Sequence, residues 1–156
     1  MTHVALDPRM REDDNKNMEK IQKIGVTAFI INKENKLLII RRTANATFLP
    51  GYYEMPGGHV EFGESPEEAL KREIGEEVNL KIESAFPYNI FSYVSGNGNK
   101  HTIDIQFIAK VAGEIKIKLS QEHEDFVWAT EEQLNEYEIT AETKDAMLKG
   151  FKIIRN

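Results

Sequence analysis

Cysteine is absent from the 156 residues of this chain. Disulfide bonds are therefore excluded, and so are metal sites built on thiolate ligands. A chain without cysteine is compatible with a reducing compartment, so we expect a cytoplasmic protein.

Long apolar runs are also absent. No segment approaches the ~20 consecutive apolar residues that a membrane-spanning helix needs. The N-terminal segment lacks the apolar stretch of a signal peptide. We therefore expect no membrane partner. Hydrophobic residues make up 40% of the chain and charged residues 29%, which is the composition of an ordinary soluble domain with its own core.

An excess of positive charge is the third feature that the chain lacks. Lysine and arginine number 20 against 26 acidic residues, which leaves a net charge of −6. This balance argues against nucleic-acid binding, since affinity for a phosphate backbone comes from basic side chains. A small phosphorylated substrate remains compatible with it, because cations held among carboxylates can bind an anion.

The N-terminal segment differs in composition from the rest of the chain. It is dense in charge and poor in core-forming side chains. We expect residues 1–20 to form a flexible arm, with a helix docked on the domain as the alternative. Residues 21–156 show no repeat, low-complexity tract or linker, and we expect them to form one domain.

Two apolar, β-branched runs open the predicted domain. They cover residues 26–31 and 36–41, and the segment Asn32–Asn35 between them has turn chemistry. We therefore expect the two runs to pair as a hairpin.

The clearest strand pattern lies in the second half of the chain. Residues 101–111 alternate between apolar and polar side chains, and residues 88–94 are the expected partner strand. The glycine- and asparagine-rich segment 95–99 is the expected connection. Shorter strands are expected at residues 115–119 and 126–129.

A helix with strong start signals lies between the two groups of strands. Ser65 is a good N-cap, Pro66 suits the first helical position, and Glu68 completes a capping box with Ser65. We expect this helix to end near Val78, with Asn79 in a left-handed conformation.

Two more helices are expected near the C-terminus. Thr130 and Gln133 form a second capping box that opens a short helix. The last helix is expected over residues 141–154, where Met147 and Phe151 lie on one stripe. Strands and three helices without a regular βαβ rhythm predict a mixed sheet packed between helices.

The first helix carries an acidic face. Glu73, Glu76 and Glu77 are spaced i, i+3 and i+4, so they share a sector of roughly 100°. Carboxylates this close repel each other and destabilise the helix, but hard cations among them make the arrangement favourable. An acidic helix face is more often plain solvated surface, so spacing alone does not decide between these readings.

The surrounding stretch, GHVEFGESPEEALKREIGEEVNL, resembles the signature box of the Nudix hydrolase family. A match of its six rigid letters arises by chance roughly once in 10⁷ starting positions, so the solvated-surface reading becomes a minor alternative. One position departs from the family pattern, because Asn79 stands where the pattern has glycine. Asparagine tolerates positive φ, so we expect the turn to survive. The residues that fill their places are Gly58, Glu64, Arg72, Glu73, Ile74, Glu76, Glu77 and Leu80.

The resemblance implies an α/β/α sandwich around a mixed β-sheet and a site for Mg²⁺, with Mn²⁺ as a substitute. It implies that Glu73 and Glu77 are metal ligands and that Glu76 is a ligand or shares the role of base. The carbonyl of Gly57 is a further implied ligand. The remaining implied positions are Glu64 and Arg72, which would orient the ligands within the catalytic group.

The implied reaction is attack of water on a bridging diphosphate. The base that accepts the proton is left open between Glu73, Glu76 and a carboxylate of a later loop, where Glu122 and Glu124 lie. As exposed loop residues, these two glutamates are more commonly solvated.

The substrate is less well specified. The segment from Glu54 to Glu64 resembles the nucleoside-triphosphate diphosphatase branch, including enzymes that remove oxidised nucleotides. Arg41, Arg42 and His59 are candidate substrate contacts, together with Glu124. A set of aromatic residues could supply a stacking surface for a base, although aromatic residues on strands are more often part of a core. They are Phe48, Tyr52, Tyr53, Phe91 and Tyr93. His3, His101 and His123 show no ligand spacing, so we assign them no role.

Two alternatives remain open from the sequence. A Nudix enzyme of another branch would act on ADP-ribose, a nucleotide sugar or a capped RNA end. A non-catalytic Nudix domain would serve as a ligand sensor or interaction module, although such domains tend to lose the glutamates that this chain keeps. We expect a monomer or a homodimer.

Overall fold

The structure is a computed structural model that describes residues 18–156. The predicted N-terminal arm therefore lies almost entirely outside the described residues. The elements follow in the order β1 (Ile21–Ile30), β2 (Leu37–Arg42), β3 (Tyr53–Glu54), β4 (Gly57–His59), α1 (Pro66–Val78), β5 (Lys81–Ser95), β6 (Lys100–Ala112), β7 (His123–Ala129), the 3₁₀ helix η2 (Glu132–Glu136) and α2 (Ala141–Arg155).

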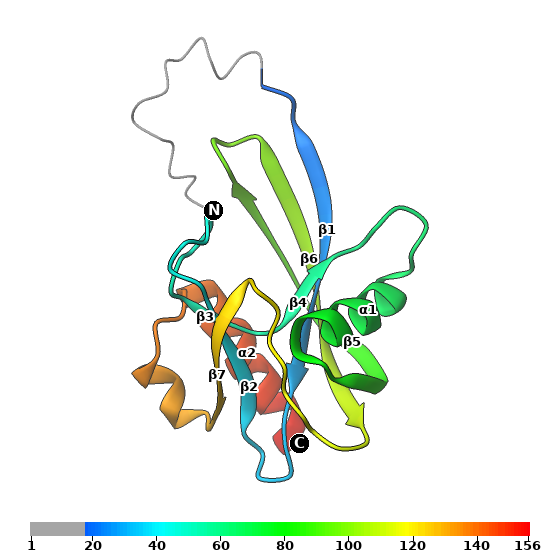
Figure 1. Ribbon diagram of the computed structural model, residues 1–156, viewed down its shortest axis with the longest axis vertical. Helices are drawn as coiled ribbons and strands as arrows, with labels where there is room; N and C mark the ends of the chain where they lie inside the picture. Colours follow the sequence, from blue (N-terminus) through cyan, green and yellow to red (C-terminus); the bar gives the residue numbers. More distant parts are fainter. Residues whose placement is uncertain (1–17) are drawn as a thin grey trace.

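The strands form two sheets that lie side by side (Figure 1). The larger sheet has the order β4-β1-β6-β5, with β1 parallel to β6 and the outer pairs antiparallel. The smaller sheet has the order β3-β2-β7 and is antiparallel throughout. The mixture of parallel and antiparallel pairs confirms the predicted mixed sheet.

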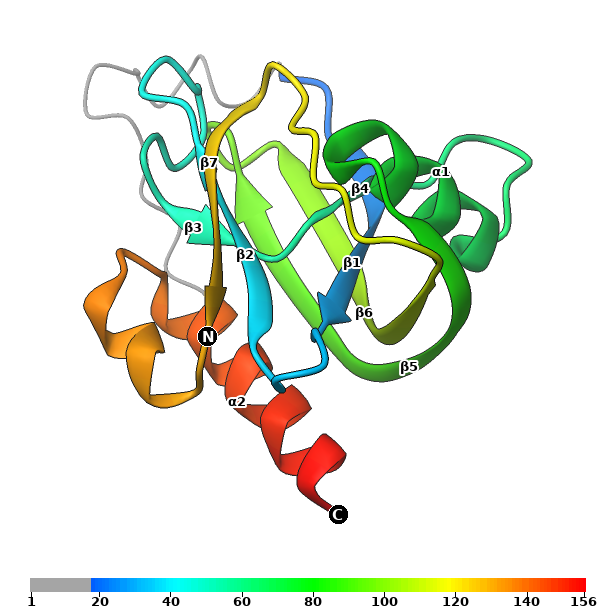
Figure 2. The ribbon, with the colours of Figure 1, turned by 60° about the horizontal axis from the view of Figure 1, so that its bottom comes forward.

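Helices α1 and α2 cover opposite faces of the strands (Figure 2). One core cluster joins Leu70, Ile74 and other apolar residues of α1 to the strands. The other joins Met147 and Phe151 of α2 to the opposite side. This three-layer arrangement confirms the predicted α/β/α sandwich.

Strand β2 is buried on both faces, which explains its continuous apolar run. Leu38 and Ile40 belong to the α1 cluster, whereas Leu37 and Ile39 belong to the α2 cluster. A strand between two helical layers needs apolar side chains at successive positions. β2 ends at Arg42, beside the loop that leads to β3. Burial of the strand therefore fixes the position of Arg42.

The predicted hairpin of residues 26–31 and 36–41 is wrong, although both strands and the turn exist. β1 pairs with β4 and β6, whereas β2 pairs with β3 and β7. Only an isolated bridge between Ile31 and Leu37 joins the two runs. The Asn32 side chain accepts hydrogen bonds from the backbone of the turn, so local chemistry made the turn, but burial on two faces separated the strands.

The strand predicted at residues 115–119 is also absent. The segment is irregular and lies beside the C-terminal end of α1. There the backbone N–H of Lys118 donates to the carbonyl of Val78. Ile117 and Leu119 still pack against the α1 cluster. The alternation of apolar side chains in residues 115–119 thus indicates burial against the core and not pairing within a sheet.

The other predicted elements are present. The strands predicted at residues 101–111, 88–94 and 126–129 lie within β6, β5 and β7, which extend further. The capping box of Thr130 and Gln133 opens η2, and α2 covers the predicted last helix. No helix within residues 18–156 has the length and apolar character to cross a membrane.

Helix α1 begins and ends as predicted. The Ser65 hydroxyl accepts from the backbone of Glu68, and the Glu68 carboxylate accepts from the backbone of Ser65. Asn79 takes the left-handed conformation with φ 60° and ψ 39°. Its side-chain amide also donates to the carbonyl of Lys116 at 3.0 Å, which glycine could not do. This bond ties the irregular segment to the end of the helix.

Substitution Asn79→Ala should lower the free energy of unfolding by about 1–2 kcal/mol, because alanine tolerates positive φ poorly and cannot make the bond to Lys116. Urea denaturation measures this loss. Asn79→Gly serves as the control, since it keeps the backbone conformation and loses only the side-chain bond. Its free energy of unfolding should lie between those of the unsubstituted protein and Asn79→Ala. An alanine variant as stable as the unsubstituted protein would contradict this account.

Candidate functional site

The acidic face of α1 lies against β4. Arg72 is at the centre of this face. Its Nε and one terminal nitrogen donate to the two carboxylate oxygens of Glu64 at 2.8 Å each. Its other terminal nitrogen donates to Glu73 at 2.8 Å and to Glu76 at 3.3 Å. The structure therefore brings together four of the residues predicted for the site.

The charges of this cluster shift the pKa values of its members. Hydrogen bonds from Arg72, followed by the backbone N–H of Glu61, lower the pKa of Glu64 to about 2. The bonds to Glu64 and then Glu73 raise the pKa of Arg72. Arg72 also donates to the backbone carbonyl of His59 at 2.9 Å, so one guanidinium connects the helix to the last residue of β4.

Glycines of β4 allow the helix to approach the strand closely. Gly57 and Gly58 pair with Thr27 and Val26 of β1. A Cβ atom on Gly58 would lie 2.1 Å from the carboxylate carbon of Glu73. A Cβ atom on Gly57 would lie 2.1 Å from the backbone oxygen of Val26. Gly58 therefore leaves room for the carboxylate of Glu73, and Gly57 leaves room for the backbone of the neighbouring strand β1.

Glu77 is the buried carboxylate of the cluster, with 6% of the residue exposed. Its Oε1 accepts a hydrogen bond from the backbone N–H of Gly57 at 2.9 Å. Burial, and then the neighbouring charges of Glu54 and Glu122, raise the pKa of Glu77 to about 8 despite that bond. A bound cation would remove this penalty, because it supplies the missing positive charge.

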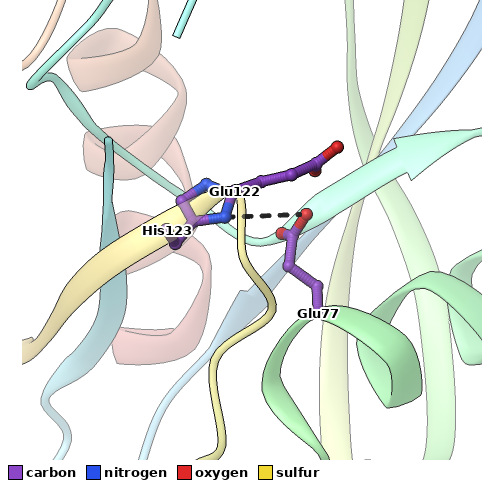
Figure 3. A group of neighbouring side chains, drawn as sticks. All are labelled: Glu77, Glu122 and His123. Carbon is purple, nitrogen blue, oxygen red and sulfur yellow. Dashed lines mark ion pairs between the residues drawn. The ribbon is translucent and has the colours of Figure 1, made fainter. Parts of the chain in front are cut away.

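His123, to which the sequence assigned no role, lies at the start of β7 and faces Glu77 (Figure 3). Its side chain is 1% exposed, and its Nε2 lies 2.9 Å from Glu54 Oε1. Its Nδ1 lies 4.0 Å from Glu77 Oε2 and has no hydrogen-bond partner. Spacing along the chain could not reveal this, because Glu54, Glu77 and His123 are far apart in sequence.

One group of potential ligands lies between α1 and the start of β7. Among the described residues, ligand atoms of Glu77, Glu122 and His123 all lie within 4.8 Å of one another. Carboxylate oxygens and an imidazole nitrogen without a partner fit a divalent cation. The structure thus brings Glu122 to the acidic helix, whereas Glu124 lies 3.5 Å from Arg41 instead.

A cleft opens beside these carboxylates. It comprises a cavity of about 270 Å³ that includes Gly58 and His59, and a second of about 630 Å³. Phe48 and Tyr93 line both, and their rings stack at 5.9 Å with an angle of 14°. Phe91 stacks on Tyr93 and lines the larger cavity. Among the predicted aromatic residues, these three form a common surface.

The other two aromatic candidates do not line the cleft. Tyr53 packs against Tyr137 in the α2 cluster and donates a hydrogen bond to Asp125 at 2.8 Å. Tyr52 lies outside the residues that line either cavity. Tyr52 ends the loop that holds Phe48 and Tyr53 begins β3, and sequence alone could not tell which of these rings face the cleft.

The two predicted arginines separate. Arg42 lines the smaller cavity, donates to Glu54 at 3.1 Å and lies over the ring of Phe48. Arg41 donates to the carbonyl of Gly51 and pairs with Glu124, outside the residues that line the cavities. Only Arg42 therefore lies where a cleft ligand would contact it.

His59 also lines the smaller cavity, as predicted for a substrate contact. Desolvation, followed by the charge of Lys23, lowers the pKa of His59. Both causes favour the neutral ring, which can offer a hydrogen bond to a ligand.

Asp104 is a cleft residue that sequence analysis did not single out. It lies on β6 and accepts from the Thr27 hydroxyl at 2.9 Å and 3.1 Å. Burial raises the pKa of Asp104 to about 6 despite bonds from Thr27 and Gln106. The signal was the polar side of the alternating 101–111 pattern, to which Asp104 belongs. Thr102 and Gln106 on that side are buried.

The buried Glu77 makes the stability of the metal-free protein depend on pH. Its folded pKa of about 8 exceeds its ordinary value of 4.5, so stability is full at low pH and falls as pH rises through about 8. Glu77→Gln should remove this loss. At about pH 9 its free energy of unfolding should exceed that of the unsubstituted protein by on the order of a few kcal/mol. Thermal unfolding in a chelator at about pH 5 and about pH 9 measures it. Parallel pH profiles for both proteins would contradict the assignment.

Comparison with known sequences agrees with this geometry. The NUDIX domain model matches residues 22–150. An ADP-ribose pyrophosphatase from Methanocaldococcus jannaschii is 42% identical over 86 residues, which cover 54% of this chain and 48% of that protein. The match therefore spans about half the length of this relative. Nucleoside triphosphatase NudI from Escherichia coli O139:H28 is 28% identical over 130 residues, covering 78% of this chain and 92% of NudI.

Solved structures show the same fold. A MutT protein from Methanosarcina mazei Go1 has a TM-score of 0.70 and 27% identity, over 90% of this chain and 99% of that one. A MutT NUDIX hydrolase from Burkholderia pseudomallei has a TM-score of 0.72 and 25% identity, over 83% and 98%. Because the domain model spans residues 22–150, well over half of the chain, this protein belongs to the Nudix hydrolase family, as its helix motif predicted.

Proposed function

We propose that this protein hydrolyses a diphosphate linkage in a nucleotide with the help of a divalent cation, Mg²⁺ or Mn²⁺. The observation that carries the proposal is the position of Gly58, which lines the aromatic-lined cleft and lies against the Glu73 carboxylate of α1. The preferred reaction converts a nucleoside triphosphate into a monophosphate and pyrophosphate, and oxidised nucleotides are included among its substrates.

The cation would be held by carboxylates of α1. Glu73 and Glu77 would be ligands with the carbonyl of Gly57, and Glu76 would be a further ligand. When bound, a divalent cation lowers the pKa of water and neutralises charge on phosphoryl oxygens. The 2.8 Å bond from Arg72 keeps Glu73 in place, and the close approach of Gly58 leaves that carboxylate little freedom.

The reaction needs a base and a leaving group. Water oxygen forms a bond to phosphorus while the bridging phosphorus–oxygen bond breaks, and the bridging oxygen leaves with its electron pair. A carboxylate accepts the proton of the water. Glu73, Glu76 and Glu122 are the candidates, because the first two share the helix face and Glu122 lies within reach of Glu77.

The nucleoside would occupy the cleft. Phe48 and Tyr93 offer aromatic faces for a base, and Asp104 with Thr27 offers polar groups below them. Arg42 and His59 line the cavity on the side of β4, where the phosphates would pass toward α1. The volumes of about 270 and 630 Å³ suit a nucleotide-sized ligand.

ADP-ribose is the second candidate substrate. It is favoured by the 42% identity over 86 residues to a protein named ADP-ribose pyrophosphatase. The triphosphate is favoured by a match that covers 78% of this chain and 92% of a nucleoside triphosphatase, whereas the match to the ADP-ribose pyrophosphatase covers about half of each protein. We therefore rank the triphosphate first.

A substrate panel with Mg²⁺ or Mn²⁺ tests this ranking. Nucleoside triphosphates should give pyrophosphate at higher kcat/KM than ADP-ribose or nucleotide sugars, and inorganic tripolyphosphate should be poor because it cannot use the aromatic cleft. Glu73→Gln and Glu77→Gln should each lower kcat at least about 10²-fold, as expected for loss of groups that act on the transition state. Glu67→Gln, an exposed position at the start of the same helix, is the matched control and should be unchanged.

Two results would overturn parts of the proposal. Higher activity on ADP-ribose would reverse the order of substrates and leave the reaction class intact. No metal-dependent hydrolysis of any panel member would favour a non-catalytic ligand-sensing domain.

Gly58→Ala should separate site geometry from stability. The new Cβ would displace the carboxylate of Glu73, which can move as the end of a flexible side chain. We expect kcat to fall about 10²-fold, the cost of a misplacement of about 1 Å, with little loss of thermal stability. Gly75→Ala is the control, because its Cβ would meet nothing nearer than 4.0 Å. Equal activities of the two variants would show that Glu73 does not need this position.

A further inference from the structure

His123 has the environment of a metal-binding histidine. Its ring is almost completely buried, and its two nitrogens face two different carboxylates. Nε2 lies 2.9 Å from Glu54 Oε1, within hydrogen-bond distance. Nδ1 lies 4.0 Å from Glu77 Oε2, which is too far for a hydrogen bond, and it has no other partner. A buried polar atom without a partner costs stability unless a ligand uses it.

The hydrogen-bond network assigns the tautomer of the ring. Glu54 Oε1 also accepts from Arg42 at 3.1 Å, so this oxygen acts as an acceptor toward both neighbours. Nε2 therefore carries the hydrogen and donates it to Glu54. In the neutral ring, Nδ1 is left with a free lone pair directed toward Glu77. Histidines that bind metals typically donate their other ring N–H to a carboxylate in this way.

The gap in front of Nδ1 has the size of a metal site. Glu77 Oε1 is occupied by the backbone of Gly57, whereas Oε2 faces the ring. Zn²⁺, a first-row metal, lies about 2.0–2.1 Å from imidazole nitrogen and about 2.0–2.2 Å from carboxylate oxygen. The 4.0 Å separation of Nδ1 and Oε2 does not exceed the sum of two such bonds, so one cation can contact both atoms. Glu122 offers a carboxylate oxygen within 4.8 Å of a ligand atom of each of the other two residues (Figure 3).

We propose that His123 Nδ1, Glu77 and Glu122 form a mixed nitrogen–oxygen position for a divalent first-row transition metal such as Mn²⁺. The inference rests on the proposed function, in that Glu77 is taken as a metal ligand. Imidazole suits transition metals, whereas Mg²⁺ prefers oxygen ligands and keeps its waters. His123 therefore gives the acidic cluster a preference for Mn²⁺ over Mg²⁺.

The same histidine links the metal position to the cleft. Arg42 and Glu54 both line the smaller cavity, and Glu54 holds the ring of His123. A chain of contacts thus runs from Arg42 through Glu54 to His123. A ligand that moves Arg42 would change the orientation of the imidazole toward the cation.

Pulsed electron paramagnetic resonance of the Mn²⁺-loaded protein, without substrate, tests direct coordination. The unsubstituted protein should show hyperfine coupling of Mn²⁺ to a nitrogen nucleus of imidazole. His123→Gln should abolish this coupling, and His59→Gln, which removes the other histidine near α1, should retain it. Absence of the coupling in the unsubstituted protein would overturn the role of His123 even where a variant folds poorly.

Calorimetric titration with each metal gives an independent measure. His123→Gln should weaken Mn²⁺ binding about 10-fold or more, in line with the usual loss at ligand-supporting positions, and leave Mg²⁺ binding within about twofold. Mn²⁺ binding without nitrogen coupling would overturn the role of His123 and leave the proposed function standing. Absence of both Mn²⁺ and Mg²⁺ binding would overturn the two together.

Discussion

The guanidinium of Arg72 holds together a helix face that would otherwise repel itself. Glu73 and Glu76 carry like charges on adjacent turns, and Arg72 bonds to both while Glu64 binds its opposite edge. The same side chain donates to the carbonyl of His59, so the helix and the strand β4 keep one relative position. The spatial relation of the carboxylates to the cleft therefore depends on this single cation. A lysine could not replace it, because a point charge lacks the planar set of donors.

The second constraint is burial of the strands from both sides. β2 sends alternate side chains into two cores, and Gly150 of α2 approaches the Phe29 ring so closely that a Cβ atom would lie 2.4 Å from it. Close packing on both faces leaves the strand ends as the place where polar side chains can gather. Arg42 and His123 are at such ends, on neighbouring strands of the smaller sheet.

The local features that sequence predicted correctly depend on neighbours in the chain. The capping box of Ser65, the left-handed Asn79 and the turn at Asn32 each involve residues within four positions. The two errors, the hairpin and the strand at residues 115–119, concern the choice of partner. An apolar run reports that a segment is buried, but it does not report which strand lies beside it. The acidic residues of α1 were found because helical spacing alone places them on one face.

Sequence by itself determined the helix motif, its caps and the family, because these depend on spacing that a helix converts directly into geometry. Tertiary structure decided which residues complete the site. Glu54, Asp104 and His123 come from three separate strands. Only the formed sheets bring Glu54 and Asp104 to the cleft and His123 to Glu54 and to Glu77 of α1. Spacing along the chain cannot predict these contacts, since contacts between distant segments are determined by how the layers pack. The absence of cysteine also limits the site, because it leaves oxygen atoms and imidazole nitrogen as the metal ligands available there.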